Sequence, residues 1–289
     1  MKPTSFSSLP RPWWALSLGG CLSLIGAEPN PDKRQYTLFN PVPTALMRPM
    51  SLDRPDKTES PYTVDAGHYQ LEMDVVNYAY DSEPGDHGQV VTEALAVAPM
   101  NWKAGLANSV DLQVIVQTYN RLRERTPQSE TIQSGFGDIL TRLKINLWGN
   151  DGGTTALAVM PYITWPTSQD DLGAPTVEGG IIVPLAVELP AEFGLGLMTE
   201  VDFLRSNSNG VAAAYVNTIT LGRPIYGALS GYVEFFSEVP PDDEPWVGTF
   251  DFGFTFALTD NMLLDAGLNI GVTRSAPDWN PFLGFSCRF

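Results

Sequence analysis

The sequence contains little cysteine, little histidine and little basic charge. Its 289 residues include two cysteines (Cys21 and Cys287), two histidines, and 17 Lys and Arg against 33 Asp and Glu, which gives a net charge of −16. If Cys21 is removed with the N-terminal leader, Cys287 is alone and no intramolecular disulfide can form. The acidic balance argues against a nucleic-acid partner, because nucleic acid requires a basic surface.

Motifs of catalysis and metal binding are also missing. The sequence has no Gly-x-Ser-x-Gly elbow, no zinc-ligand cluster and no phosphate-binding loop. His68 lies at the start of an expected strand and His87 lies in an expected loop, so neither is a candidate for chemistry. We therefore expect no enzyme activity, no metal and no cofactor.

After residue 27 the sequence lacks any apolar run approaching the length of about 18 residues that a membrane-spanning helix needs. The N-terminal stretch WWALSLGGCLSLIGA is 15 residues long and, with the basic residues before it, predicts a signal peptide at residues 1–27. Leu18-Gly19-Gly20-Cys21 resembles a lipobox, so an alternative is a lipoprotein in which Cys21 carries the lipid. Both interpretations export the chain, and a membrane location would then require a β-barrel.

What the sequence does contain is alternation of apolar and polar residues. In FDFGFTFALTDNMLLDAGLNIGV (residues 250–272) every second residue is apolar on both sides of a short Thr-Asp-Asn turn, the pattern of strands with one apolar and one polar face. Within the predicted barrel domain (residues 67–289), twelve such runs can be counted. They are residues 68–80, 90–104, 110–120, 138–148, 154–165, 180–189, 193–204, 211–221, 227–237, 246–258, 261–273 and 280–289.

Two environments could cover the apolar faces: a second sheet in a soluble sandwich, or lipid. Lipid is favoured because the runs are long enough to cross a bilayer with tilted strands, and because long and short connections alternate, as in outer-membrane barrels. Aromatic residues near run ends, such as Trp102, Trp148 and Trp279, are typical of membrane interfaces. The C-terminal PFLGFSCRF, ending in Phe289, predicts recognition by the barrel assembly machinery. We predict an all-β fold, a single up-and-down antiparallel barrel of about twelve strands.

The polar faces of the runs should line the lumen of this barrel. The candidate lumen residues are mostly acidic, and two explanations stay open: an acid-lined, water-filled pore that favours cations or neutral solutes, or a buried network of ion pairs in a closed barrel. The candidates are Glu72, Asp74, Asp111, Arg142, Lys144, Glu200, Asp202, Glu234, Asp251 and Asp265.

Residues 28–66 precede the barrel and show no hydrophobic period, but contain many prolines. We expect an irregular N-terminal periplasmic segment. The charged stretch LDRPDKTESP, with Asp53, Arg54, Asp56 and Lys57, is a candidate plug that folds into the periplasmic mouth. The alternative is a tether without a fixed position.

Several stretches resemble one known family. SLDRPDKTESPYTVDAGHYQLEMD (51–74), GFGD (135–138), PYITWPT (161–167) and EGGIIVPLAVELP (178–190) are similar to the transporter family named for the MetA pathway of phenol degradation. The resemblance extends over about residues 52–289 and implies an outer-membrane β-barrel with a transport role. The family name implies aromatic compounds for some members.

The sequence thus predicts a barrel in the outer membrane of a Gram-negative-type bacterium, in contact with outer-membrane lipid. The first functional hypothesis is passive passage of small solutes, aromatic or weakly polar, through an acid-lined lumen. The alternative is a non-conducting structural or binding barrel that acts through its external loops.

Overall fold

The computed structural model describes residues 32–85, 88–206 and 210–289. The predicted signal peptide at residues 1–27 lies outside these ranges. Within these ranges, apart from one short 3-10 helix, Thr44–Leu46, the regular structure consists of strands that form one sheet. The strands are β1 (Tyr69–Gly85), β2 (Gly88–Val97), β3 (Met100–Ala107), β4 (Val110–Val116), β5 (Tyr119–Arg125), β6 (Glu130–Gly135), β7 (Ile139–Trp148), β8 (Thr155–Trp165), β9 (Glu178–Leu189), β10 (Phe193–Arg205), β11 (Val211–Tyr226), β12 (Leu229–Val239), β13 (Val247–Thr259), β14 (Met262–Gly271) and β15 (Trp279–Arg288).

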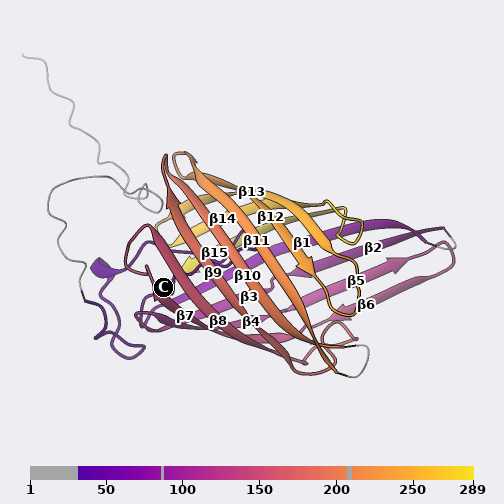
Figure 1. The fold of residues 1–289 in the computed structure, drawn as a ribbon, viewed down its shortest axis with the longest axis horizontal. Coiled ribbons are helices and arrows are strands. Elements are labelled where there is room, and N and C mark those ends of the chain that lie inside the picture. The colour runs from indigo at the N-terminus through magenta and orange to yellow at the C-terminus, as the bar shows by residue number, and fades with distance from the viewer. Residues whose placement is uncertain (1–31, 86–87, 207–209) are drawn as a thin grey trace, which may run out of the picture.

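Twelve of these strands close into a ring (Figure 1). Starting from β1, the order around the ring is β3, β4, β7 and then β8 to β15 in sequence, and β15 pairs with β1 to close it. Every pairing is antiparallel. Closure pairs every strand of the ring on both sides, so the ring has no edge strand. The prediction of a twelve-stranded antiparallel barrel is confirmed.

The remaining strands, β2, β5 and β6, continue β3, β4 and β7 beyond the ring at the right-hand end of Figure 1. The sequence prediction for this region was wrong, because residues 121–137 were expected to be a loop and instead contribute to the β5–β6 hairpin. This hairpin projects past the ring, where neither face needs to be apolar. Its sequence therefore carries charges, such as Arg121, Arg123 and Glu124, in place of the alternation used for the prediction.

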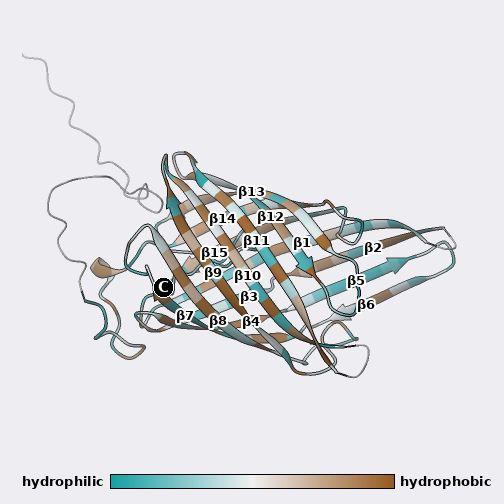
Figure 2. Cartoon of the chain, in the orientation of Figure 1, coloured by the Kyte–Doolittle hydropathy of each residue, from teal (hydrophilic) through white to brown (hydrophobic). Residues whose placement is uncertain are grey.

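Side chains alternate between the outside and the inside of the ring. Figure 2 shows the corresponding stripes of hydrophobic and hydrophilic residues along the strands. On β13, Phe250, Phe254 and Phe256 are exposed on the outer face, whereas Asp251 is fully buried inside. The apolar face of this strand therefore points away from the barrel interior, as expected for contact with lipid. The alternation along β1 changes parity near Val76, where the register between β1 and β15 shifts between Asp74 and Val76.

The two ends of the barrel differ. Short turns join β3 to β4, β9 to β10, β11 to β12 and β13 to β14 at one end, which we call the short-turn end, and the chain terminus Phe289 lies there with Tyr69. The longer connections, such as residues 166–177 between β8 and β9, lie at the opposite end. Among the described residues, no helix has the length and apolar character needed to cross a membrane.

Candidate functional site: the barrel interior and its N-terminal segment

Residues 48–65 run inside the ring before the chain enters β1. We call this stretch the inner segment. Its side chains and backbone contact inward-facing residues of β1, β3, β4, β7, β10, β11, β12, β13 and β14. A segment that bonds to strands on most sides of the ring lies within the barrel.

The inner segment is irregular, so its buried N–H groups have no ladder partner and need acceptors elsewhere. Inward-facing carboxylates supply them. Glu72 accepts the amide of Asp53 at 3.0 Å, Glu234 accepts the amide of Lys57 at 2.8 Å, and Asp111 accepts the amide of Val64 at 3.0 Å.

Asp53 of the inner segment lies between two buried bases of the barrel wall. Its carboxylate pairs with the ammonium groups of Lys103 on β3 and Lys144 on β7, both of which are almost fully buried. Lys103 also pairs with Glu72. Burial alone would raise the pKa of Asp53, but the two ammonium groups outweigh it and hold that pKa well below its usual value.

Two bases of the inner segment reach the other side of the ring. The guanidinium of Arg54 lies 2.6 Å from Asp74 on β1 and 2.7 Å from Asp265 on β14. The ammonium of Lys57 lies 3.1 Å from Asp251 on β13. The negative charges of these inward-facing acids are therefore balanced by the bases of the inner segment.

Two further acids of the inner segment are less well compensated. Burial raises the pKa of Asp56, and the nearby carboxylate of Glu234 raises it further. Burial also raises the pKa of Glu59, although Arg142 on β7 pairs with it. Both carboxyl groups are thus harder to ionise inside the barrel than in water.

We call the inward side chains that bond to the inner segment the polar wall. They are Glu72, Asp74, Lys103, Asp111, Arg142, Lys144, Glu234, Asp251 and Asp265.

The inner face of β8, β9 and the start of β10 is different. Its inward positions carry small residues, which we call the small-residue wall: Ala156 and Ala158 on β8, Ala186 on β9, and Gly194 and Gly196 on β10. Further along the same strands lies an apolar cluster of Met160, Ile182, Met198 and Val216, against which Tyr162 and Phe236 pack.

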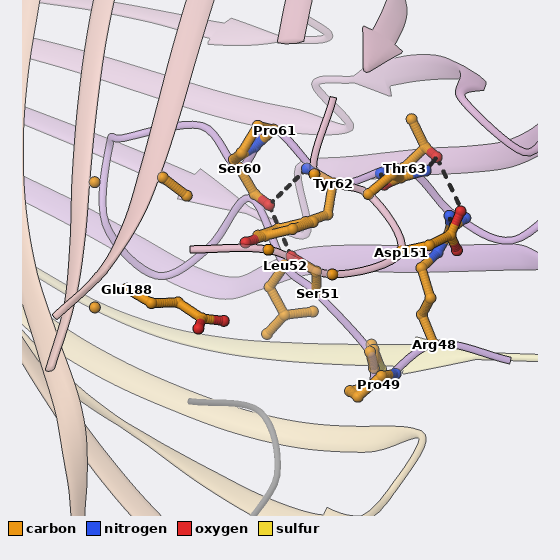
Figure 3. A pocket seen from close by; sticks show the side chains of 18 of the residues that line it. Arg48, Pro49, Ser51, Leu52, Ser60, Pro61, Tyr62, Thr63, Asp151 and Glu188 are labelled. Atoms are coloured by element: carbon orange, nitrogen blue, oxygen red, sulfur yellow. Dashed lines mark hydrogen bonds and ion pairs between the residues drawn. The ribbon is translucent and has the colours of Figure 1, made fainter. Parts of the chain in front are cut away.

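A cavity of about 630 Å³ separates the inner segment from the small-residue wall. Ala186, Gly194 and Gly196 line one side, and Met50, Leu52, Pro61 and Tyr62 of the inner segment are among the residues on the other. Figure 3 shows the segment side of this cavity, where Ser60 bonds to the Ser51 hydroxyl at 2.7 Å and accepts the Tyr62 amide at 3.3 Å.

The structure places the residues predicted from the sequence as follows. All the candidate lumen residues except Glu200 and Asp202 belong to the polar wall. Within the described residues, those two form no ion pair with the inner segment, and Asp202 instead accepts a hydrogen bond from the Tyr162 hydroxyl. Of the plug candidates, Asp53, Arg54 and Lys57 bond to the wall, and Asp56 lines the cavity.

Sequence reasoning missed Lys103 and the small-residue wall. Lys103 lies in the run of residues 90–104, where apolar and polar residues do not alternate strictly, so the sequence does not show which face its side chain occupies. The small residues carry no chemical signal of their own, and their role depends on which part of the inner segment lies opposite them.

Comparison with known proteins agrees with this geometry. The model of the family described as "Putative MetA-pathway of phenol degradation" matches residues 52–289. The chain is similar in structure to the COG4313 outer membrane channel from Pseudomonas putida F1, with a TM-score of 0.59 at 14% identity over 83% of this chain and 100% of that one. It also matches the Ralstonia pickettii toluene transporter TbuX, with a TM-score of 0.44 at 8% identity over 77% and 89% of the two chains. No curated protein gives a significant match.

The closed barrel, its apolar outer face and this likeness place the protein in the outer membrane. The apolar side chains on the outer surface, such as Phe250 and Phe254, therefore contact lipid.

Proposed function

The chain belongs to the family of the MetA pathway of phenol degradation, and from this premise we propose that it is an outer-membrane passage for small, uncharged or weakly polar solutes. The inner segment acts as its plug at the periplasmic end. The observation that carries this proposal is that an irregular segment, together with an adjoining cavity, occupies the interior in place of a continuous core formed by the barrel's own side chains.

The contacts of the inner segment are suited to a removable plug. They are hydrogen bonds and ion pairs to side chains of the wall, and each of these groups can be hydrated by water when the segment leaves. An apolar core would instead expose apolar surface to water when the channel opened. The COG4313 protein, which this chain resembles in fold, is an outer membrane channel, and this likeness supports passage rather than catalysis as the activity.

Removal of the inner segment would expose the charged groups of the lumen wall to water. The bases Arg54 and Lys57 would leave together with the acids Asp53, Asp56 and Glu59. The six acids of the polar wall, with Glu200 and Asp202, would then face the inward bases Lys103, Arg142, Lys144 and Arg288. The opened lumen would then be acid-lined and would favour cations over anions.

The test is single-channel recording in planar bilayers with the full chain and with a variant lacking residues 28–62. The deletion variant should show larger conductance and a cation-selective reversal potential. If both proteins form heat-modifiable barrels and neither conducts, the proposal fails and a non-conducting barrel that acts through its loops is favoured.

We also propose that the barrel assembly machinery recognises Phe289. Its backbone pairs with Tyr69 at the seam, while its side chain is 61% exposed at the short-turn end. Phe289→Ala should lower the yield of barrel in the outer membrane without changing refolding of the purified chain in detergent. Equal yields in cells would exclude this role.

A further inference from the structure

The outer face of the barrel carries a continuous row of paired residues at the end with the long connections. Trp279 on β15 lies opposite Tyr80 on β1, and Tyr80 lies opposite Glu93 on β2. Glu93 in turn lies opposite Arg123 on β5. On its other side Trp279 lies opposite Ile270, which is exposed on the outer surface. Residues directly opposite each other in a sheet share a face, so Arg123 lies on the outer face.

Aromatic rings mark the level of this row relative to the membrane. The rings of Tyr78 and Tyr80 each lie 5.5 Å from the ring of Trp279, measured between centroids, and Trp279 is exposed on the outer surface. Tyrosine and tryptophan on the lipid-facing side of a barrel lie at the boundary between hydrocarbon and headgroups. Because the longer connections of outer-membrane barrels face the outside, this level is the boundary of the outer leaflet.

On the membrane side of these aromatic rings the same outer face is apolar. Val97 on β2 lies opposite both Val76 on β1 and Tyr119 on β5, and all three side chains are exposed. We call these three residues the apolar patch, which acyl chains of the outer leaflet can cover. From this patch β5 continues outward into the hairpin that projects beyond the ring (Figure 1).

Arginines replace the apolar residues as β5 leaves the apolar patch. Arg121, Arg123 and Arg125 occupy alternate positions, so all three lie on the outer face. Arg123 is compensated, because its guanidinium lies 3.0 Å from Glu93 and 2.9 Å from Glu130. Among the residues that the structure describes, Arg121 and Arg125 form no ion pair. The outer face of β5 therefore presents uncompensated positive charge in a chain whose net charge is −16.

The position of Arg121 is suited to an anion held beside the membrane. A small cavity of about 70 Å³ borders Arg121, Tyr78 and Leu95 on this face. The planar guanidinium group of an arginine donates paired hydrogen bonds that match the geometry of a phosphate. A lipid with a phosphorylated headgroup therefore fits this face, with its acyl chains on the apolar patch and a phosphate against Arg121.

We propose that Arg121 and Arg125 bind phosphate groups of lipopolysaccharide, the phosphorylated glycolipid of the outer leaflet, while its acyl chains cover the apolar patch. This site lies on the outer surface and is independent of solute passage through the interior. It assigns the β5–β6 hairpin, which lies beyond the ring, a function in contact with a specific lipid.

The test measures equilibrium binding of fluorescently labelled lipopolysaccharide to the refolded full chain in detergent. The double variant Arg121→Gln, Arg125→Gln removes the two uncompensated charges. The matched control is Arg34→Gln, Arg223→Gln, which removes the same charge from two exposed arginines outside this hairpin. Heat modifiability of each purified protein establishes that it has folded as a barrel.

The wild type and the control variant should bind with equal affinity. The double variant should bind roughly tenfold more weakly or worse, because each lost contact is a hydrogen bond between charged groups. Dephosphorylated lipopolysaccharide should bind the wild type as weakly as the intact lipid binds the double variant. If the double variant keeps wild-type affinity, or if the control variant loses as much, these arginines do not form the site.

Inorganic phosphate as a competitor distinguishes a lipid site from a site for free phosphate. It cannot contact the apolar patch, so even a large excess should displace little of the labelled lipid. Complete displacement by inorganic phosphate would show that the arginines recognise the free anion, and the assignment to a lipid would then be wrong.

Discussion

The two sides of the barrel interior are built on the same backbone but treat the inner segment differently. The polar wall holds the segment with ion pairs and with carboxylates that accept its amides. The small-residue wall faces the same segment across a cavity. Because both are inner faces of antiparallel strands in one ring, the difference arises from side chains alone.

This contrast indicates how one side of a barrel interior can hold an inserted segment while the other side leaves space beside it. Contacts with the polar wall fix the position of the inner segment. The small-residue wall therefore does not need to bind the segment, and the cavity between them can keep a constant shape. The position of the segment therefore depends on the polar wall, and changes there should alter how firmly it is held.

The largest effect is expected from Asp53→Asn, which removes the charge between Lys103 and Lys144. Breaking a buried ion pair by removing one partner costs about 3–5 kcal/mol, which corresponds to roughly two to four orders of magnitude in the population of the released segment. Trypsin cleavage after Lys57 in the folded barrel should accelerate accordingly.

Asp32→Asn is the control for this change, because Asp32 pairs with Arg34 on the exposed surface. It should leave the cleavage rate unchanged. If Asp53→Asn is cleaved no faster than this control, the polar wall does not hold the segment through Asp53.

A smaller effect is expected from Arg54→Gln, which removes the link from the inner segment to Asp74 and Asp265. Hydrogen bonds to charged groups contribute about 1.5–3 kcal/mol, and Arg54 retains some exposure to water. In planar bilayers the variant should open more often than the wild type, and Arg34→Gln should not. If Arg54→Gln and the wild type open equally often, Arg54 does not hold the inner segment in place.

The smallest effect is expected from Asp56→Asn, and it has the opposite sign. Because burial and Glu234 raise the pKa of Asp56, its ionised form opposes docking, and this cost appears as pH rises above the ordinary pKa of 3.8. The amide should therefore slow cleavage of the segment a few-fold at neutral pH. The advantage should vanish in acid, where Asp56 is protonated, and faster cleavage of the variant at neutral pH would contradict this assignment.

Much of the fold could be predicted from the sequence because lipid imposes a local rule. Every second residue of a lipid-facing strand must be apolar, so runs such as residues 193–204 and 246–258 identified strands and their outer faces without any tertiary information. The β5–β6 hairpin was missed because it lies beyond the ring, where the rule does not apply.

The contacts of the barrel interior were harder to predict from the sequence, because they join residues that are far apart in the chain. Alternation assigned Asp265 to an inner face, but nothing local to it indicates that Arg54 is its partner. No local sequence pattern indicates the cavity, because its position depends on which part of the inner segment lies opposite Ala186 and Gly194.

The seam between β1 and β15 has a consequence for how the chain reaches this state. It pairs Gln70 with Arg288, so the first and last strands of the barrel meet only when almost the whole chain is in place. Contacts between such distant residues close a large loop and slow folding. The inner segment is joined directly to β1, one side of that seam. Closing the seam therefore places the segment in the lumen and the final strand beside it in a single late event.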